Sequence, residues 1–397
     1  MVSWQRQRRT SLNQNSLSQL RNCQRAWVEI DLNALADNVS ALKAWLGPKT
    51  KLMAVVKADA YGHGAETVAQ IALSKGADNL AIATLAEGVE LRQAGITAPI
   101  LILGAINAVE DIKALAAWEL EATICNESQA EIFDRTLAQL GKTARVHLKL
   151  DTGMSRLGTS WQAAVKFVSQ VRHLSNLEIA SVYSHFATAD DRDRTVMDLQ
   201  HQRFQNAMAQ LKLDGFTPPL VHLANSAAAL GDRSTHYDLV RVGLALYGLY
   251  PAPHLNEVLN LKPTLQVKAK VTQVKTILPG EGISYGRKFI TEAETKVAVV
   301  GIGYADGVPR NLSNRIKAIV NGQLASQIGA ITMDQLMLKI DNLGHVKAGD
   351  VVTFIGQQGR LKITADDWAN KLDTISWEIL CGFKHRLPRI YSRTKLY

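Results

Sequence analysis

The sequence predicts an α/β protein in which an N-terminal (β/α)8 TIM-like barrel is followed by a C-terminal, mostly-β domain. Three observations lead to this fold class: eight short apolar runs alternate with helical patterns, the texture changes after residue 260, and no apolar run could span a membrane. The 397 residues leave room for two or three domains, and 47% hydrophobic residues are usual for a globular protein. A doubly wound sheet remains the structural alternative to the barrel.

The predicted barrel covers residues 25–260 and contains eight apolar runs of strand length. These runs are residues 52–56, 80–83, 100–103, 122–124, 146–150, 179–183, 220–223 and 239–242. Apolar residues at helical spacing lie between them, as in residues 33–46, 86–94, 109–117, 126–140 and 194–211. A further alternating segment, Ala26–Asp31, precedes the first barrel strand and is a candidate strand of another sheet.

Residues 261–397 are predicted to form the mostly-β domain. Strand-like segments follow one another here without long helical patterns, at residues 264–277, 296–301, 316–320, 336–340 and 351–355. Glycine-containing breaks at residues 279–280 and 321–322 separate some of them, and the Asn-Gly pair at 321–322 is a strong hairpin signal.

The net charge of +9 is concentrated at the two ends of the chain. Residues 1–24 carry four arginines and no acid, and residues 383–397 carry five basic residues and no acid, which leaves the body uncharged overall. A nucleic-acid partner is therefore not expected, because such binders carry a basic face on the body. The composition of residues 1–24 predicts a disordered basic tail, with an organelle transit peptide as the alternative.

Cysteine usage points to a reducing compartment. The three cysteines are scattered and odd in number, so they do not make a disulfide framework, and no CxxC pair indicates a zinc site. We therefore expect a cytoplasmic location, no metal and no membrane partner.

Polar residues occur at the carboxyl ends of the predicted barrel strands, where barrel enzymes place their reactive groups. Lys57 directly follows the first strand, and Lys149 and His185 lie at the ends of later ones. Partial desolvation of Lys57 at the barrel mouth penalises its ammonium form, so its pKa should fall and its amine become available for Schiff-base chemistry. A surface lysine is the ordinary alternative at such a position.

Eight motifs in fixed order make the chain similar to the alanine racemases. They are AVVKADAYGHG, LKLDTGMSRLG, YSHFATAD, HLANSAA, RVGLALYGLYP, ISYGRKF, GIGYADGVPR and ITMDQ, and the resemblance runs from about residue 25 to the C-terminus. This family consists of pyridoxal 5'-phosphate enzymes with a barrel and a β domain, which act as homodimers with shared active sites. The resemblance implies interconversion of L-alanine and D-alanine, which supplies D-alanine for peptidoglycan.

The resemblance also implies the catalytic residues. Lys57 would carry the cofactor and act as one proton-transfer base, and Tyr285 of a partner subunit would be the opposite base. Two bases suit racemisation, because one side chain does not easily reach both faces of a planar carbanion. Arg241 would face the cofactor ring nitrogen, which a guanidinium keeps unprotonated, and His222 would orient Arg241.

Further positions match the family's binding residues. The cofactor residues are Tyr61, His185, Ser226, Gly243, Leu244 and Trp377. The residues that meet the substrate carboxylate are Arg156 and, through its backbone, Met333. The substrate-entrance residues are Tyr304, Asp306 and Arg310. Lys149 matches a lysine that many members carry as a carbamate, which would hold the substrate arginine; an unmodified lysine is the alternative.

The chain departs from the family pattern at two positions. Trp377 stands where the cofactor site usually has a tyrosine, so an indole N–H replaces a hydroxyl. Ala330 stands where many members have arginine, which predicts a less cationic entrance and a minor activity on residues such as serine. A broader-specificity racemase and a non-catalytic cofactor carrier stay open as alternatives, although known carriers of this fold resemble the barrel alone. The lack of adjacent glycines and of a Cys-x-x-x-Asp segment disfavours a decarboxylase.

Overall fold

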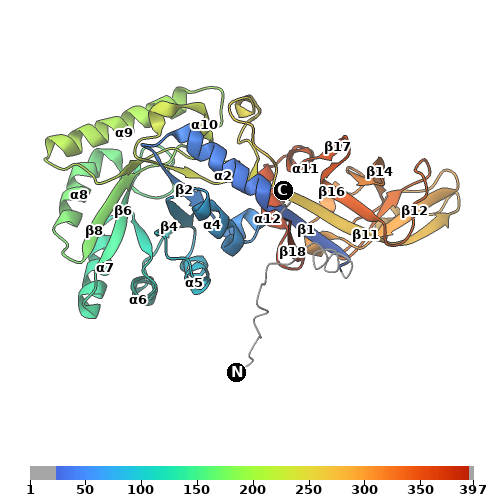
Figure 1. Cartoon of the computed structure of the whole chain (residues 1–397), viewed down its shortest axis with the longest axis horizontal. Coiled ribbons are helices and arrows are strands. Elements are labelled where there is room, and N and C mark those ends of the chain that lie inside the picture. The colour runs from blue at the N-terminus through green and yellow to red at the C-terminus, as the bar shows by residue number, and fades with distance from the viewer. Residues whose placement is uncertain (1–23, 393–397) are drawn as a thin grey trace. The chain divides into compact units, whose positions relative to one another are not determined.

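The computed structural model describes residues 24–392, so nearly all of the predicted tail at residues 1–24 lies outside the described residues. The chain forms two compact units (Figure 1). Residues 34–263 make up the first unit, and the second joins the residues up to Asn33 with those from Thr264 onward. No helix in residues 24–392 is long and apolar enough to cross a membrane.

The first unit is a closed barrel of eight parallel strands. They are β2 (Lys51–Val55), β3 (Asn79–Ile82), β4 (Ile100–Ala105), β5 (Glu121–Ile124), β6 (Ala144–Asp151), β8 (Leu177–Tyr183), β9 (Val221–His222) and β10 (Leu239–Val242). Strand β10 pairs with β2, and β5 pairs with β6, which closes the sheet. All eight predicted apolar runs lie on these strands, and the predicted barrel is confirmed.

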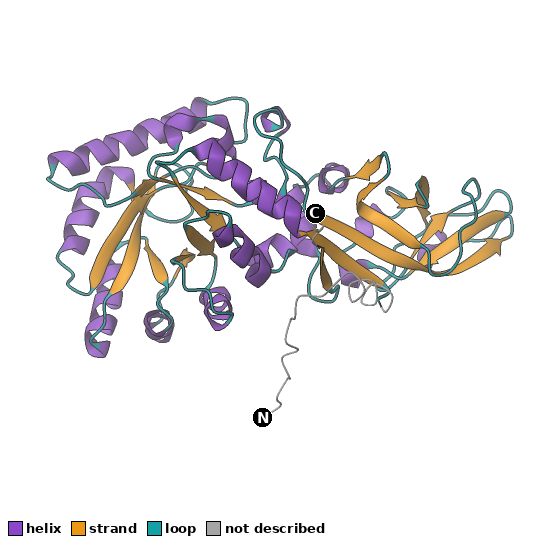
Figure 2. Cartoon of the chain, in the orientation of Figure 1, coloured by secondary structure: helices purple, strands orange, loops and turns teal. Residues whose placement is uncertain are grey.

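Helices connect the barrel strands and cover their outer face (Figure 2). They are α2 (Leu32–Leu46), α4 (Ala65–Ser74), α5 (Leu85–Gln93), α6 (Val109–Ala117), α7 (Glu127–Leu140), α8 (Ala164–Arg172), α9 (Thr195–Leu213) and α10 (Ser226–Gly231). Local sequence sets several ends: Thr84 and Glu87 form a capping box for α5, and Asn126 caps α7. Because helices cover one face and side chains fill the other, the strands are mostly apolar, and several polar residues on them are buried inside the barrel unit.

The second unit is built on a nine-stranded sheet. Its strands are β1 (Ala26–Asp31), β11 (Leu265–Ile277), β12 (Thr295–Val300), β13 (Lys317–Val320), β14 (Gln323–Ile328), β15 (Leu336–Lys339), β16 (Val351–Gln358), β17 (Leu361–Ile363) and β18 (Arg389–Ser392). Asn321 and Gly322 form the turn between β13 and β14, both with positive φ, as a two-residue hairpin requires. Two short helices, α11 (Ala365–Leu372) and α12 (Ser376–Gly382), follow β17. The predicted mostly-β domain is confirmed.

Strand β1 belongs to the second sheet. It pairs antiparallel with β11 and parallel with β18. The units of the structure therefore differ from the predicted limits of 25–260, which placed this segment with the barrel. Its alternating pattern had indicated another sheet, and this pattern was the better guide.

Gly248 provides a test of close packing in the barrel unit. Its φ is +77°, and a Cβ built on it would lie 1.8 Å from the carbonyl oxygen of Lys262. We expect Gly248→Ala to lower the free energy of unfolding by at least ~2 kcal/mol, because left-handed strain adds to a backbone clash. Gly95→Ala is the control, with a φ of +85° and no atom within 4 Å of its Cβ, and it should lose ~1 kcal/mol. Equal losses in denaturant titrations would contradict this account.

Candidate active site

His185, at the carboxyl end of the barrel, contacts Arg241 and lies within electrostatic range of three further cationic side chains. Burial lowers the pKa of His185 well below its usual value, and the charges of Arg241, Lys149, Arg156 and Lys57 lower it further. These residues come from β10, β6, the loop after β6 and the turn after β2. Since one imidazole senses all four charges, the structure brings these predicted site residues together.

The segment α3 (Lys57–Gly62) that follows β2 is not an ordinary helix. Four consecutive residues after the lysine have φ between 52° and 54°, in a left-handed region that costs non-glycine residues about 1–2 kcal/mol each. Carboxylates hold both ends of this turn: Ala58 N–H donates to Glu87 Oε1 at 2.6 Å, and Ala65 N–H donates to Asp59 Oδ1 at 2.8 Å. Strain of this kind at a candidate reactive lysine is typical of functional sites.

Tyr61, at the end of this turn, lies against the backbone of Gly243. A Cβ built on Gly243 would stand 2.5 Å from the Tyr61 hydroxyl, so no other residue type fits there without displacing the ring. Ser226 Oγ accepts the Gly243 N–H at 2.9 Å, and the adjacent Leu244 is buried. The hydroxyls of Tyr61 and Ser226 are therefore placed around a single glycine.

Lys149 is buried within the barrel, with its Nζ 4.8 Å from the centre of the Tyr183 ring. Burial lowers its pKa to about 7, and the charges of Arg241 and Arg156 contribute to this shift. Asp151 shapes the following loop, because its carboxylate accepts three successive backbone N–H groups at residues 153–155. This loop carries Arg156, whose side chain is exposed.

Arg241 is buried and held by four acceptors. Its Nη1 donates to His222 Nδ1 at 2.7 Å, and its Nη2 donates to the Ser184 and Leu223 carbonyls and to His185 Nδ1, at 2.7 to 3.0 Å. Burial lowers the pKa of Arg241 to about 10, so the guanidinium stays charged at neutral pH. Burial also lowers the pKa of His222 well below its usual value, with the Arg241 charge adding to the effect, so this imidazole is neutral.

Three cations of this cluster have no carboxylate partner in the described residues. Within residues 24–392, Lys149, Arg156 and Arg241 form no ion pair. A group of cations of this kind, two of them buried, is suited to an anionic ligand, such as a phosphate or a carboxylate.

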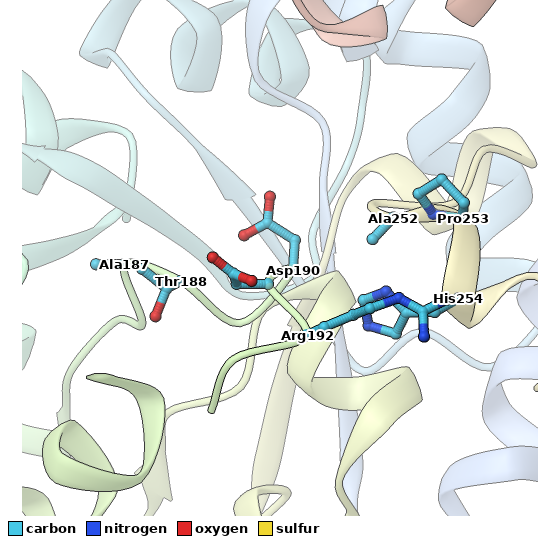
Figure 3. A pocket seen from close by; sticks show the side chains of 8 residues that line it. Ala187, Thr188, Asp190, Arg192, Ala252, Pro253 and His254 are labelled. Carbon is cyan, nitrogen blue, oxygen red and sulfur yellow. The ribbon is translucent and has the colours of Figure 1, made fainter. Parts of the chain in front are cut away.

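A pocket of about 420 Å³ lies beside the loop that follows β8 and carries His185. Residues 187–188, 190–192 and 252–254 line it (Figure 3). The hydroxyl of Thr188 is buried here and has no hydrogen-bond partner among the described residues. The sequence motif YSHFATAD supplies part of this lining, but its residue pattern did not predict a pocket.

In the second unit, Tyr285 is 73% exposed at the start of a short 3-10 turn, Tyr285–Arg287. The preceding Ser284 has a φ of 65°, and its hydroxyl donates to the Ala330 carbonyl at 2.8 Å. Ala330 itself is fully buried. The backbone carbonyl of Ala330 therefore anchors the residue that precedes the Tyr285 turn.

Backbone hydrogen bonds join two loops of the second unit. Tyr304 N–H donates to the Thr332 carbonyl at 2.9 Å, and Ala305 N–H donates to the Met333 carbonyl at 3.1 Å. The side chains of Tyr304 and Met333 are both exposed, as is Arg310. Trp377 lies on α12 and is half-buried.

Asp306, which the resemblance places at the substrate entrance, is a buried carboxylate in an ion pair. Its carboxylate is fully buried and accepts hydrogen bonds from both terminal nitrogens of Arg25, at 2.7 and 2.9 Å. Arg386 approaches the same carboxylate at 3.5 Å. We therefore assign Asp306 an anchoring role, which ties its loop to the start of β1.

Sequence reasoning missed the polar residues that lie inside the barrel below this site. His147 stands two positions before Lys149 in β6, and Ser181 lies in the apolar run of β8. Residues two apart on a strand share a face, so His147 points inward whenever Lys149 does. The sequence could have indicated these residues, because each is a polar residue within a mostly apolar run.

Comparisons with known proteins match both units. The profile of the alanine racemase N-terminal domain matches residues 30–251, and that of the C-terminal domain matches residues 264–391. An alanine racemase of Nostoc sp. is 61% identical, over 92% of this chain and 96% of its own length, and one of Synechocystis sp. is 60% identical, over 92% and 99%. The crystal structure of alanine racemase from Bacillus anthracis with bound L-Ala-P has a TM-score of 0.88 and 37% identity, over 93% of this chain and 95% of its own.

The left-handed turn after Lys57 yields a stability prediction. Ala58 is exposed and has a φ of 53°, which costs alanine more than it costs glycine. We expect Ala58→Gly to raise the free energy of unfolding by up to ~1 kcal/mol, since the relieved strain exceeds the added entropy of the unfolded chain. Ala138→Gly, at an exposed position of the right-handed helix α7, should lower it by ~0.5–1 kcal/mol. Thermal unfolding of both variants is the measurement, and a loss of stability in Ala58→Gly would contradict the strain.

Proposed function

The chain belongs to the alanine racemase family, and on that premise we propose how its residues interconvert L-alanine and D-alanine. The observation that carries the proposal is the cluster of Lys57, Lys149, Arg156 and Arg241 around His185 at the carboxyl end of the barrel. The product D-alanine would serve peptidoglycan synthesis. A cytoplasmic location is part of the proposal, and the low number of cysteines supports it.

Pyridoxal 5'-phosphate fits the residues of this cluster. The Lys57 amine would hold it covalently, and Tyr61 and Ser226 would hold its phosphate together with backbone groups at residues 243–244. Ser226 Oγ already accepts the Gly243 N–H, so its own hydroxyl hydrogen is available to a phosphate oxygen. The Nε–H of Arg241 has no acceptor among the described residues, which suits it to the cofactor ring nitrogen. When bound, the cofactor supplies an electron sink that makes the substrate Cα proton acidic.

The proton transfers then fall to side chains of the protein. Racemisation requires that a proton leave one face of Cα and return on the other, so two groups are needed. We assign these roles to Lys57 and Tyr285, with Arg156 binding the substrate carboxylate through its planar fork and the Met333 backbone assisting. Arg241 retains its charge at neutral pH, so it would keep the ring nitrogen of a bound cofactor unprotonated.

Other predicted residues have supporting roles in the proposal. Tyr304 and Arg310 would border the substrate entrance, since both are exposed. Trp377 would stand near the cofactor in place of a tyrosine, with one indole N–H to donate.

We further propose that two copies of the chain share their active sites. Tyr285 is exposed and belongs to the second unit, whereas Lys57 belongs to the barrel. An exposed catalytic tyrosine needs a partner surface to exclude water from its proton transfer. A two-fold dimer would let each chain give its Tyr285 to the Lys57 of the other.

The proposed dimer leads to a complementation experiment. Lys57→Ala and Tyr285→Phe should each abolish most exchange of the alanine Cα proton in D2O, measured by NMR together with chiral chromatography. Mixing the two inactive variants under subunit exchange should restore about a quarter of the wild-type activity. This fraction follows because half of the dimers are mixed and each mixed dimer has one intact site of two.

Several outcomes would contradict this arrangement. Failure of the mixture to regain activity, with mixed dimers shown by mass spectrometry, would mean that both bases come from one chain. Exchange without D-alanine would mean that the second base is misplaced. Parallel assays with L-serine separate a strict alanine enzyme from a broader racemase, and bound cofactor without any exchange would favour the carrier alternative.

We also propose that Lys149 reacts with CO2 to form a carbamate. The neutral amine attacks CO2, an N–C bond forms, and one proton is released, so the cation becomes an anion between Arg156 and Arg241. Because the pKa of Lys149 is about 7, the reactive amine is well populated at neutral pH.

The carbamate proposal has its own measurement. With carbon-13 bicarbonate, the protein should show a carbamate signal by NMR that increases as the pH is raised from 6 to 8, because deprotonation of Lys149 must come first. Lys149→Ala should lack the signal, and Lys166→Ala, an exposed lysine, should retain it. A spectrum of the wild type without this signal at pH 8 would leave Lys149 unmodified.

A further inference from the structure

A continuous chain of hydrogen bonds crosses the barrel interior from Arg241 to the start of β5. Arg241 Nη1 lies 2.7 Å from His222 Nδ1, and His222 Nε2 lies 2.8 Å from Ser181 Oγ. Ser181 Oγ lies 2.6 Å from His147 Nδ1, and His147 Nε2 lies 2.8 Å from Glu121 Oε2. The five side chains come from five barrel strands, and all five residues are buried.

The direction of these hydrogen bonds follows from the arginine end. A guanidinium only donates, so His222 Nδ1 must accept. Because His222 is neutral, its proton is on Nε2, which donates to Ser181. The Ser181 hydroxyl then donates to His147 Nδ1, the only acceptor available to it among the described residues.

The carboxylate end requires the same direction. With Nδ1 of His147 accepting, the ring proton is on Nε2 and points at Glu121, and a carboxylate only accepts. Although burial by itself raises the pKa of Glu121, its hydrogen bond and electrostatic interaction with His147 and the charges of Arg145 and Arg92 outweigh it, and the pKa is lowered. Protonating His147 on both nitrogens would aim two donors at Ser181 Oγ and leave its hydroxyl hydrogen unsatisfied, at a cost of ~1–3 kcal/mol.

The barrel interior offers Arg241 no direct counter-ion. No carboxylate in the described part of the chain contacts its guanidinium, and every acceptor it has is neutral. Glu121 is linked to it only through the chain, in which each hydrogen bond polarises the next. The Tyr183 ring stacks on His222 with centroids 4.6 Å apart and an angle of 9°, which fixes the plane of that imidazole.

We propose that Glu121 is a positioning residue which, by accepting the last hydrogen bond of this chain, fixes the form of His222 that receives Arg241. The inference deepens the proposed racemase function and rests on it only where turnover is measured. Without an acceptor at residue 121, a proton on His147 Nε2 would have no partner, whereas a proton on Nδ1 could be donated to Ser181 Oγ. Ser181 would then turn its hydroxyl toward His222 Nε2, and a proton on His222 Nδ1 would face the donors of Arg241.

Histidine tautomers give a test that needs no turnover. In the full-length chain labelled with nitrogen-15 histidine, long-range NMR spectra separate the two neutral forms, and His147→Gln and His222→Gln assign the signals. We expect both residues to carry the proton on Nε2 at pH 7. A doubly protonated His147, or a proton on Nδ1 of either ring, would overturn the inference in the wild type alone.

Variants test the link to Arg241. Glu121→Met removes the acceptor at similar size, so it should move the His147 proton to Nδ1 and disturb His222, whereas Glu121→Gln keeps an acceptor oxygen and should preserve both forms. Glu178→Gln is the matched control, because Glu178 contacts the same Arg145 but is exposed and outside the chain. In Glu121→Met, kcat should fall about tenfold or more with KM for alanine changed less, since a misplaced cation acts on the reaction and not on substrate binding.

A double variant separates positioning from general stability. Ser181→Ala interrupts the chain, so adding Glu121→Met to it should bring no further loss of kcat. Additive losses, or an unchanged His222 signal in Glu121→Met, would overturn the inference. If the wild type shows the expected tautomers and no turnover, the proposed function fails while the positioning role of Glu121 stands on the NMR result.

Discussion

A buried guanidinium is the constraint around which the barrel interior is arranged. Arg241 remains charged where water is excluded, and a buried charge is costly unless neighbouring groups supply hydrogen bonds. Barrel interiors are usually filled with branched apolar side chains, whereas here two histidines, a serine and a glutamate occupy inward positions. These polar side chains form the hydrogen-bond chain that ends at the buried Arg241 cation.

The segment that carries Lys57 is held in place in a different way. The left-handed turn after β2 stores conformational strain, and the carboxylates of Glu87 and Asp59 hold its two ends. These hydrogen bonds restrain the backbone that leads from Lys57 to Tyr61. The candidate site thus combines an electrostatic constraint at Arg241 with a conformational one at the turn after β2.

The barrel strands were predictable because strands buried on both faces are continuous apolar runs. Strand β14 and helix α10 were not, since the first alternates weakly and the second is too short to display a period. Motifs pointed to Lys57, Arg241 and Asp306, but they did not indicate the buried ion pair of Asp306 with Arg25. Arg25 lies 281 positions away in sequence, and no local pattern reports such a contact. The hydrogen-bond chain was missed for a similar reason, because it needs the register of five strands.

The order of the two units along the chain has a consequence for the order in which their strands are synthesised. Strand β1 is made first, yet its partners β11 and β18 follow only after the whole barrel has been synthesised. The barrel is therefore an insertion within the β unit, and Asp31 N–H donates to the Thr264 carbonyl at 2.8 Å where the chain leaves and returns. Adjacent exit points are what domain insertion requires. The β sheet therefore gains the partners of its first strand only after the whole barrel sequence has been synthesised, which ties completion of this sheet to the end of translation.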